Sequence, residues 1–439
     1  MTDLFGHSIR SELLALYLAE ALVSFVAIYA LFTWGFGQIS TVHALSLAAG
    51  LALCSGLLSG IGGLYQPETL SRTGRLLAGT AVASAVLLLL ALPAFGLLGS
   101  PLAAPGQHTW PAFAAVLVFS LAVITTRLGF LAALRRGLFR HRLVLVRDAS
   151  GTPPVIGERH DPFEVALSVT AAATISAEWL RTQRVWGLVA ADPAAIPPVV
   201  RARCNEAQVR IFDAAEFRER RLNRVDIDTL PPGWLERACK GQDGPLEAGI
   251  RRGFDILLSL LLLAVTLPLT LATALAIKLD SPGPVFYRQE RVGRGGRVFT
   301  LYKFRSMVVD AERGGARWAS KGDPRVTRVG RVIRLARIDE IPQVLNVLKG
   351  DMAFVGPRPE RPGFVAELRE IIPHYDDRAV VKPGITGWAQ VNYPYGASVE
   401  DSRMKLAYDL YYIRRRSLFL DLLILIGTIR VVLFQEGAR

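Results

Sequence analysis

The chain has 439 residues, 51% of them hydrophobic, with 51 Lys and Arg against 38 Asp and Glu and a formal net charge of +13. So much apolar content excludes intrinsic disorder, and its combination with a basic excess predicts lipid-facing stretches in one part and a cationic globular part in another. The three cysteines form no C-x-x-C pair and no H-E-x-x-H spacing occurs. Neither a disulfide framework nor a thiolate metal site is therefore expected.

Four long apolar runs come first, at about residues 11–33, 43–65, 76–99 and 111–133. Each is long enough to cross a hydrocarbon core of about 30 Å as a helix. Apart from Arg127 they are almost free of ionisable side chains, whereas a proton or ion pathway normally needs such groups at depth. The runs predict a four-span transmembrane domain over residues 1–138 that acts as an anchor rather than as a transporter.

Basic residues in the connecting loops predict the orientation of these spans. The stretches 34–42 and 100–110 contain no Lys or Arg, whereas the loop between the second and third runs contains Arg72 and Arg75. Four arginines follow the last run, at Arg135, Arg136, Arg140 and Arg142. By the positive-inside rule, both ends of the four-helix unit are expected in the cytoplasm.

Residues 139–245 are more polar, and short apolar runs alternate there with charged segments. The segments 142–147, 184–192 and 209–214 read as strands, and 194–208 can form a helix between the last two. The first strand is followed by DASGTPPV, which lacks the G-x-G-x-x-G of a dinucleotide-binding loop. We expect a small, degenerate Rossmann-like, nucleotide-binding-like α/β domain with a structural or oligomerising role, and a nucleotide-sensing role stays open.

A fifth apolar run covers residues 254–277, with basic residues at both ends, which fits poorly with a simple crossing. Pro268, near its middle, removes a backbone donor and clashes with the preceding turn. We expect a helix over 250–279 that breaks at Pro268, enters one leaflet and returns to the side from which it came. The alternative is an ordinary kinked span, which would place everything after it on the other side of the membrane.

From residue 280 to about 416 the chain is polar and basic, with fifteen Lys and Arg against six Asp and Glu between residues 288 and 349. Two predicted strands flank a glycine-rich turn at 293–296, which lacks the G-K-[ST] of a Walker A loop. The charge favours anionic lipid headgroups or a polyphosphate ligand. Nucleic acid is not expected, because no helix-turn-helix, zinc-finger or aromatic RNA-binding pattern accompanies the basic residues.

The segment RLARIDEIPQVLNVLKGDMAFVGPRPERP (334–362) contains the candidate chemistry. Its apolar residues are spaced for one helical face and Pro342 is tolerated only in a first turn, so the helix is expected to begin with Asp339 as N-cap. A helix N-terminus favours a carboxylate and an incoming phosphate together. Of the adjacent acids Asp339 and Glu340, one can act as nucleophile while the other helps to hold Mg²⁺. The alternative is an ordinary structural cap.

The GPRPERP part of this segment favours the catalytic interpretation. Its prolines and glycine are expected to fix a loop around Arg358, and an immobilised guanidinium is a good bidentate ligand for phosphate. The alternative is a tight turn with an exposed arginine.

Six ordered segments have a familiar pattern: RRGFD (251–255), LDSPGPVFYRQERVGRGGRVFTLYKFRSM (279–307), DPRVTRVGRVIR (323–334), IDEIPQVLNVLKGDMAFVGPRP (338–359), KPGITGWAQVNY (382–393) and YDLYYIRRRSLFLDLLIL (408–425). Together they closely resemble the bacterial sugar transferases. These are the monotopic phosphoglycosyl transferases, also called polyprenyl-phosphate hexose-1-phosphate transferases. The half with four spans resembles the large members that prime exopolysaccharide synthesis.

The resemblance implies roles for individual residues. Asp339 and Glu340 match the family's catalytic dyad, in which the Asp attacks the β-phosphate of a UDP-sugar, releases UMP and forms a sugar-phosphoryl-aspartate. A polyprenyl phosphate then takes up the sugar phosphate. The dyad is also expected to hold Mg²⁺, and Pro268 matches the helix-breaking proline of the family's re-entrant helix. The expected phosphate- and substrate-binding residues are Arg334, Arg358, Lys303 and Arg305.

The resemblance also implies the whole arrangement. It is a multi-pass protein of the bacterial inner membrane, in which membrane α and α/β parts precede an α+β catalytic domain over 246–439 on the cytoplasmic face. An interfacial C-terminal helix over 417–434 is expected beside the re-entrant one. The expected partners are a UDP-sugar, undecaprenyl phosphate and membrane lipids. A homodimer through 141–240 and the identity of the sugar stay open. An inactive scaffold and a transferase with its site inside the spans are the alternatives.

Overall fold

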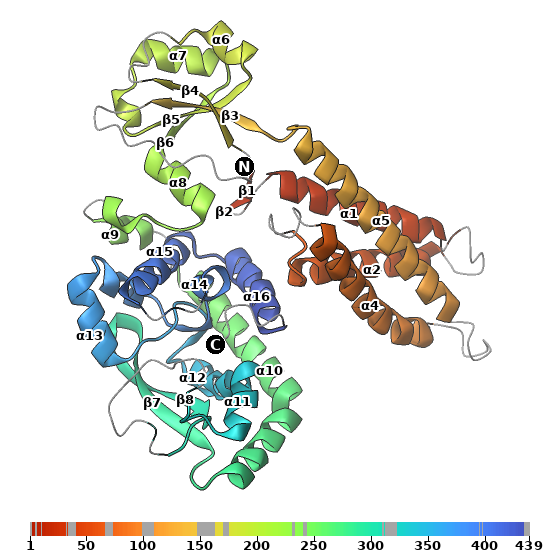
Figure 1. The fold of residues 1–439 in the computed structure, drawn as a ribbon, viewed down its shortest axis with the longest axis vertical. Coiled ribbons are helices and arrows are strands. Elements are labelled where there is room, and N and C mark those ends of the chain that lie inside the picture. The colour runs from red at the N-terminus through yellow and green to blue at the C-terminus, as the bar shows by residue number, and fades with distance from the viewer. Residues whose placement is uncertain are drawn as a thin grey trace. The chain divides into compact units, whose positions relative to one another are not determined.

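The computed structural model describes residues 2–4, 7–9, 11–31, 33, 41–65, 73–98, 109–146, 163–169, 175–230, 233–239, 244–309, 311, 323–394, 396 and 398–433. The chain divides into two compact units, Met1–Phe217 and Arg218–Arg439 (Figure 1). The first contains the predicted transmembrane and α/β parts. The second contains the predicted catalytic part together with residues 218–239.

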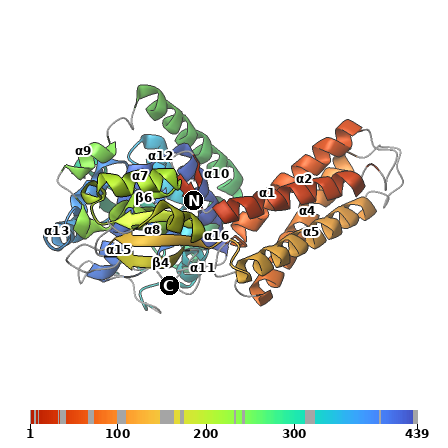
Figure 2. The ribbon, with the colours of Figure 1, turned by 90° about the horizontal axis from the view of Figure 1, so that it is seen from above.

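The first unit begins with two short antiparallel strands, β1 (Thr2–Leu4) and β2 (His7–Ile9). Four long helices follow: α1 (Ser11–Ala30), α2 (Thr41–Ile61), α4 (Thr73–Leu98) and α5 (Thr109–Arg135). Figures 1 and 2 show them side by side as a bundle, in which α1 and α4 each pack against both α2 and α5. The four apolar runs are thus confirmed as helices.

The surface of this bundle suits lipid. Over the described residues, α1, α2 and α5 are each long and apolar enough to cross a membrane, and α4 contributes a shorter apolar stretch at Leu77–Leu87. Leu22, Leu53 and Leu117 are more than 60% exposed, whereas Phe119 is buried between the helices. Exposed leucines on several helices are unfavourable in water and favourable in hydrocarbon, so the bundle indicates a membrane protein.

One charged cluster lies inside the bundle. Arg127 of α5 is fully buried, and its Nε donates to Glu20 Oε1 of α1 at 2.6 Å. The Tyr65 hydroxyl donates to the other oxygen of the same carboxylate at 2.7 Å. The expectation that Arg127 is nearly alone among the spans is therefore wrong, because an acid on the neighbouring helix lies beside it. Pairing is what allows two such charges to remain in a low-dielectric interior.

Several predictions fall largely on residues that the structure does not describe. These are the stretches 34–42 and 100–110, Arg72, and the DASGTPPV segment at 148–155. The orientation of the spans therefore stays a prediction.

The polar part of the first unit is a four-stranded parallel sheet in the order β4–β3–β5–β6. Its elements are β3 (His141–Val146), β4 (Phe163–Val169), α6 (Ala177–Thr182), β5 (Val185–Ala190), the 3₁₀ turn Pro193–Ala195, α7 (Pro198–Glu206) and β6 (Arg210–Asp213). The next helix, α8 (Ala214–Leu222), begins in the first unit and ends in the second. Val144 and Leu188 are buried on one face, and Leu143 and Phe217 on the other, as in other covered parallel sheets. The predicted strands and helix are confirmed, and β4 is an additional edge strand.

The second unit is mostly helical. Its helices are α9 (Trp234–Cys239), α10 (Pro245–Asp280), α11 (Arg328–Leu335), α12 (Val344–Lys349), α13 (Pro362–Ile371), α14 (Trp388–Asn392), α15 (Val399–Arg415) and α16 (Leu418–Leu433). Its 3₁₀ helices are η4 (Ile227–Thr229), η5 (Arg294–Gly296), η6 (Ile338–Gln343) and η7 (Tyr375–Val380). The strands β7 (Phe286–Val292) and β8 (Val298–Phe304) form the predicted antiparallel hairpin, and β9 (Ala353–Val355) pairs in parallel with β10 (Gly384–Thr386).

The largest core of this unit surrounds α15. Leu410 and Ile413 are fully buried there with Ile424 of α16. Val225 and Trp234, which precede α10, join the same core. Residues 218–239 are therefore part of the packing of the second unit, and not a loose linker.

Helix α10 runs without interruption from Pro245 to Asp280 and contains Pro268 (Figure 1). The predicted break is thus not present as a gap in the helix. Around Pro268, the hydroxyls of Thr266 and Thr270 donate to nearby backbone carbonyls. By length and composition, α10 is also able to cross a membrane.

Candidate active site

The two adjacent acids lie on η6, between α11 and α12. After α11, Arg337 adopts a left-handed conformation with φ of 56°, and the chain forms a 3₁₀ helix before α12 begins at Val344. The predicted helix start at Asp339 is wrong, because Pro342 has no N–H to donate and the α-helical pattern forms only after it. Asp339 is therefore not an N-cap, and α12 has only six residues. Positive charge at this site must come from side chains.

The fully buried Asn346 of α12 ties this segment to β8. Its Oδ1 accepts from the Tyr302 N–H at 3.1 Å, and its Nδ2 donates to the Thr300 carbonyl at 2.7 Å. Val347 is buried beside it, whereas Leu345, one of the apolar residues whose spacing predicted a single helical face, is 44% exposed. Sequence reasoning missed Asn346, although a lone amide in an apolar helical run is a recognisable signal. Its two bonds hold η6 beside the strand that carries Lys303.

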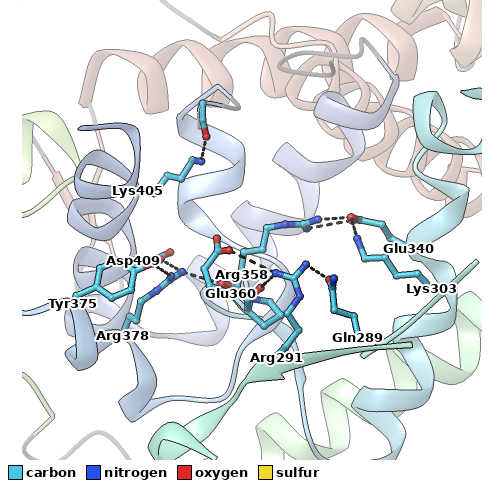
Figure 3. Close-up of polar contacts among 12 residues, drawn as sticks. Gln289, Arg291, Lys303, Glu340, Arg358, Glu360, Tyr375, Arg378, Lys405 and Asp409 are labelled. Atoms are coloured by element: carbon cyan, nitrogen blue, oxygen red, sulfur yellow. Dashed lines mark hydrogen bonds and ion pairs between the residues drawn. The ribbon is translucent and has the colours of Figure 1, made fainter. Parts of the chain in front are cut away.

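Glu340 is at the centre of the site (Figure 3). Lys303 Nζ donates to Glu340 Oε1 at 2.8 Å, and the Arg358 guanidinium bonds both carboxylate oxygens, with 3.3 Å to Oε2. Burial alone would raise the pKa of Glu340, but Arg358 and Lys303 together lower it well below its usual value. Glu340 in turn raises the pKa of Arg358. The structure thus brings three of the expected site residues together.

Asp339 lies beside this cluster in a different environment. It is 8% exposed, and no described residue donates a hydrogen bond to its carboxylate. Burial raises the pKa of Asp339, and Glu340 raises it further, whereas Lys303 and Arg334 lower it. Arg334 is therefore within electrostatic reach of Asp339 without bonding it. A carboxylate without donors and with little water is a stronger nucleophile than a solvated one.

Arg305 is not brought to the dyad. Its guanidinium donates to the carbonyls of Ile277, Ser281 and Pro282, at 3.3, 2.7 and 2.6 Å. Gly283 has φ of 124°, and a Cβ there would overlap this guanidinium. In this structure Arg305 therefore fixes the turn that follows α10.

The loop that carries Arg358 depends on close contact between two glycine-containing motifs. The Gly384 N–H donates to the Pro357 carbonyl at 2.9 Å. A Cβ on Gly356 would lie 2.5 Å from the Lys382 carbonyl oxygen, and one on Gly384 would overlap the backbone of Gly356. Both positions therefore require glycine. The predicted loop around Arg358 is present, and its arginine faces Glu340.

Further charged and polar side chains surround this loop and were missed from the sequence (Figure 3). They are Arg291, Glu360, Tyr375, Arg378 and Asp409. Some lie within segments that resemble the family, but neither their spacing nor their residue type marks them as partners. Their pairing joins parts of the chain far apart in sequence, which a local pattern does not reveal.

Two adjacent carboxylates are the oxygen donors available for Mg²⁺. Within the described ranges, no group of three or more His, Cys, Asp or Glu side chains could hold a metal ion. Mg²⁺ is commonly bound by one or two carboxylates and completes its shell with water and substrate phosphates. Asp339 and Glu340 therefore fit a metal that binds together with a phosphate substrate, and they form no dedicated cage.

Comparison with known proteins points to one family. Residues 246–435 match the family described as bacterial sugar transferase. The chain is 49% identical over 238 residues to the UDP-N-acetylgalactosamine-undecaprenyl-phosphate N-acetylgalactosaminephosphotransferase of Aeromonas hydrophila, which is 54% of this chain and 56% of that relative. It is 48% identical over 187 residues to the UDP-glucose:undecaprenyl-phosphate glucose-1-phosphate transferase of Xanthomonas campestris pv. campestris, 42% of this chain and 39% of the relative.

These two matches span about half or less of each relative's own length. A third relative is covered almost completely. The Exopolysaccharide production protein PSS of Rhizobium leguminosarum bv. phaseoli is 42% identical over 190 residues, which is 42% of this chain and 95% of that protein. The chain therefore belongs to the bacterial sugar transferase family.

Proposed function

We propose that this chain transfers a sugar-1-phosphate from a UDP-sugar to undecaprenyl phosphate and so initiates an exopolysaccharide or another surface glycan. The observation that carries the proposal is the Glu340 carboxylate held by Lys303 and Arg358 beside the buried Asp339. The names of two relatives specify this kind of transfer, with N-acetylgalactosamine in one and glucose in the other. They support the reaction class and leave the sugar open.

The proposed reaction has two steps. A diphosphate carries negative charge that must be neutralised before a carboxylate can approach it, and Lys303 and Arg358 supply positive charge. An Asp339 oxygen attacks the β-phosphorus, the bond from that phosphorus to the bridging oxygen breaks, and UMP leaves with this oxygen. An oxygen of undecaprenyl phosphate then attacks the same phosphorus, and the bond to Asp339 breaks. The carboxylate is regenerated and the sugar phosphate is on the lipid.

Glu340 and Asp339 would hold Mg²⁺ together with the substrate phosphates. When bound, the metal would neutralise charge on the diphosphate and on the departing UMP. Arg358 and Lys303 lower the pKa of Glu340, so this carboxylate is ionised and able to act as a ligand at neutral pH. Removal of divalent cations should therefore stop UMP release, and added Mg²⁺ should restore it.

We also propose that α10 is re-entrant. Near its start, Arg252 donates to the carbonyls of Val347 and Leu348, each at 2.6 Å. Near its end, Ile277 packs against Phe304. A crossing helix would carry these ends to opposite faces of the bilayer, whereas here both ends contact elements of one basic unit. This supports a helix that enters and leaves on the same side.

We further propose an inner-membrane protein with its catalytic part on the cytoplasmic face, because a UDP-sugar is available there. Leu420 and Ile424 of α16 are buried, while Leu422, Ile429 and Leu433 are 49%, 45% and 64% exposed. An apolar outer face on a packed helix fits a position at the membrane interface.

The test uses the full chain in nanodiscs with undecaprenyl phosphate and a panel of radiolabelled UDP-sugars. At least one sugar should give UMP and lipid-linked product in equal amounts. Asp339→Ala should abolish both, whereas Glu370→Ala, which removes an acid whose side chain is 77% exposed on α13, should retain them. Without acceptor, the denatured wild type should retain labelled sugar phosphate and Asp339→Ala should retain none.

Three outcomes would contradict parts of the proposal. Full turnover by Asp339→Ala excludes the phospho-aspartyl route. A wild-type chain that is inactive with every UDP-sugar indicates a scaffold. Activity that is unchanged in Glu340→Gln indicates a site elsewhere, such as inside the spans.

A further inference from the structure

The backbone of the Arg358 loop is bonded at four consecutive carbonyls, those of residues 357–360. Their donors, in order, are Gly384 N–H, Arg378 Nη2, Arg291 Nη1 and Val292 N–H, each at 2.9 Å. These donors come from three separate regions of the chain. A loop bonded in this way has little freedom to rotate, so the direction of the Arg358 side chain is set by groups outside the dyad.

Arg378 is the donor to the carbonyl of Arg358 itself. The same Nη2 also donates to Asp409 Oδ2 at 2.8 Å, and Nη1 donates to the Tyr375 hydroxyl at 3.0 Å (Figure 3). The Asp409 side chain is only 2% exposed, on α15 in the main core. The planar guanidinium thus connects the loop, η7 and α15 at one point.

The choice of an arginine here has an electrostatic cost. Its positive charge is buried, and a neutral donor would satisfy the carbonyl of Arg358 equally well. Burial alone would lower the pKa of Arg378, but Tyr375, Asp409 and Glu360 raise it, so the guanidinium stays charged. A guanidinium, unlike a neutral donor, can bond three groups in fixed directions. The advantage of an arginine at position 378 is therefore the fixed geometry of its hydrogen bonds.

We propose that Arg378 and Asp409 are positioning residues for the transfer reaction. Asp409 orients Arg378, and Arg378 holds the carbonyl of Arg358 so that the Arg358 guanidinium faces Glu340 and the substrate phosphate. The inference rests on the proposed function, because the pair is assigned a role in that transfer reaction. Arg378 and Asp409 act through Arg358 and do not contact the substrate.

The first test compares kcat and KM for UMP release in nanodiscs. Arg378→Ala and Asp409→Asn should each lower kcat by about 10- to 100-fold, the loss expected from misplacing a reacting group by about 1 Å. The KM for the UDP-sugar should change by less than about threefold. The matched control is Arg403→Ala, which removes another arginine–carboxylate pair of α15, with the exposed Asp228, and should leave both constants unchanged.

The second test separates positioning from loss of folding. If Arg378 acts through Arg358, Arg358→Ala combined with Arg378→Ala should be no slower than Arg358→Ala alone. A merely destabilising change would lower the active fraction further in the double variant. Thermal midpoints of all variants in the same nanodiscs report folding independently of activity.

The third test uses pH. Burial raises the pKa of Asp409 to about 6, although Arg378 opposes the shift. Glu360 from the loop, Tyr375 from η7 and Lys405 from α15 also face this pair. Asp409 is ionised above about pH 6 and becomes neutral below it, so wild-type kcat should fall as pH drops through 6. Asp409→Asn should lack this component.

The outcomes distinguish the inference from the proposed function. An active wild type with kcat and pH profile unchanged in Arg378→Ala and Asp409→Asn overturns the inference alone. Additive losses in the double variant do the same. A wild type and an Arg403→Ala variant that both lack activity overturn the proposed function, and the positioning role with it.

Discussion

Replacing Lys303 by Met tests how the charge of Glu340 is maintained. The substitution keeps most of the buried side-chain volume and removes the 2.8 Å bond to Glu340 Oε1, while Arg358 remains in place. A hydrogen bond to a charged group contributes about 1.5–3 kcal/mol, so its loss raises the pKa of Glu340 from its depressed value. Arg358 alone should still keep Glu340 ionised at pH 7.5.

The assay is the pH dependence of kcat/KM for UMP release. The pKa of Glu340 is depressed, so its protonation should add an acid step at lower pH than the step near pH 6 expected from Asp409, and the substitution should move this lower step to higher pH. At pH 7.5 the variant should lose about 10- to 150-fold through the missing contact with phosphate. Lys349→Met, which replaces a lysine whose side chain is 62% exposed, is the control. An unshifted lower acid step in Lys303→Met would refute the reasoning.

Three further changes probe the structure around the site and the bundle. Gly384→Ala should abolish UMP release and lower the thermal midpoint, because its Cβ would overlap the backbone of Gly356. Asn346→Ala leaves two partly buried β8 backbone groups without their partner and should cost about 1–3 kcal/mol of unfolding free energy, measured by denaturant titration. Glu20→Gln should lower the thermal midpoint by leaving the buried Arg127 charge without a carboxylate, and Glu20→Leu with Arg127→Leu should restore much of the loss.

Periodicity and turn chemistry predicted much of the fold. Apolar runs of about 20 residues identified the helices of the bundle, since a helix satisfies all backbone hydrogen bonds of a single segment in hydrocarbon. The glycine-rich turn identified the hairpin of β7 and β8, and short apolar runs identified the buried strands β3 and β5. The GPRP sequence predicted the Arg358 loop, because proline and glycine restrict the backbone locally.

Features that depend on distant partners could not be predicted in this way. Arg305 and Arg358 are both arginines in basic segments, yet one bonds the end of α10 and the other bonds Glu340. Asp339 is a residue type that is favoured at N-caps, but Pro342 and the conformation of Arg337 displace the start of the α-helix beyond it. The roles of these residues are decided by which elements pack beside them, and single-residue patterns carry little of that information.

The four bonded carbonyls of the Arg358 loop explain why the site is assembled from so many distant segments. A cation lowers a reaction barrier most when it already points to where negative charge develops, because no free energy is then spent on reorganisation. A loop held only by its own turn would relax around its resident partner, Glu340. Bonds from β7, η7 and β10 prevent this, since each donor belongs to an element fixed by its own packing. Substitutions in those elements, far from the dyad in sequence, should therefore alter the rate of transfer more than the binding of the UDP-sugar.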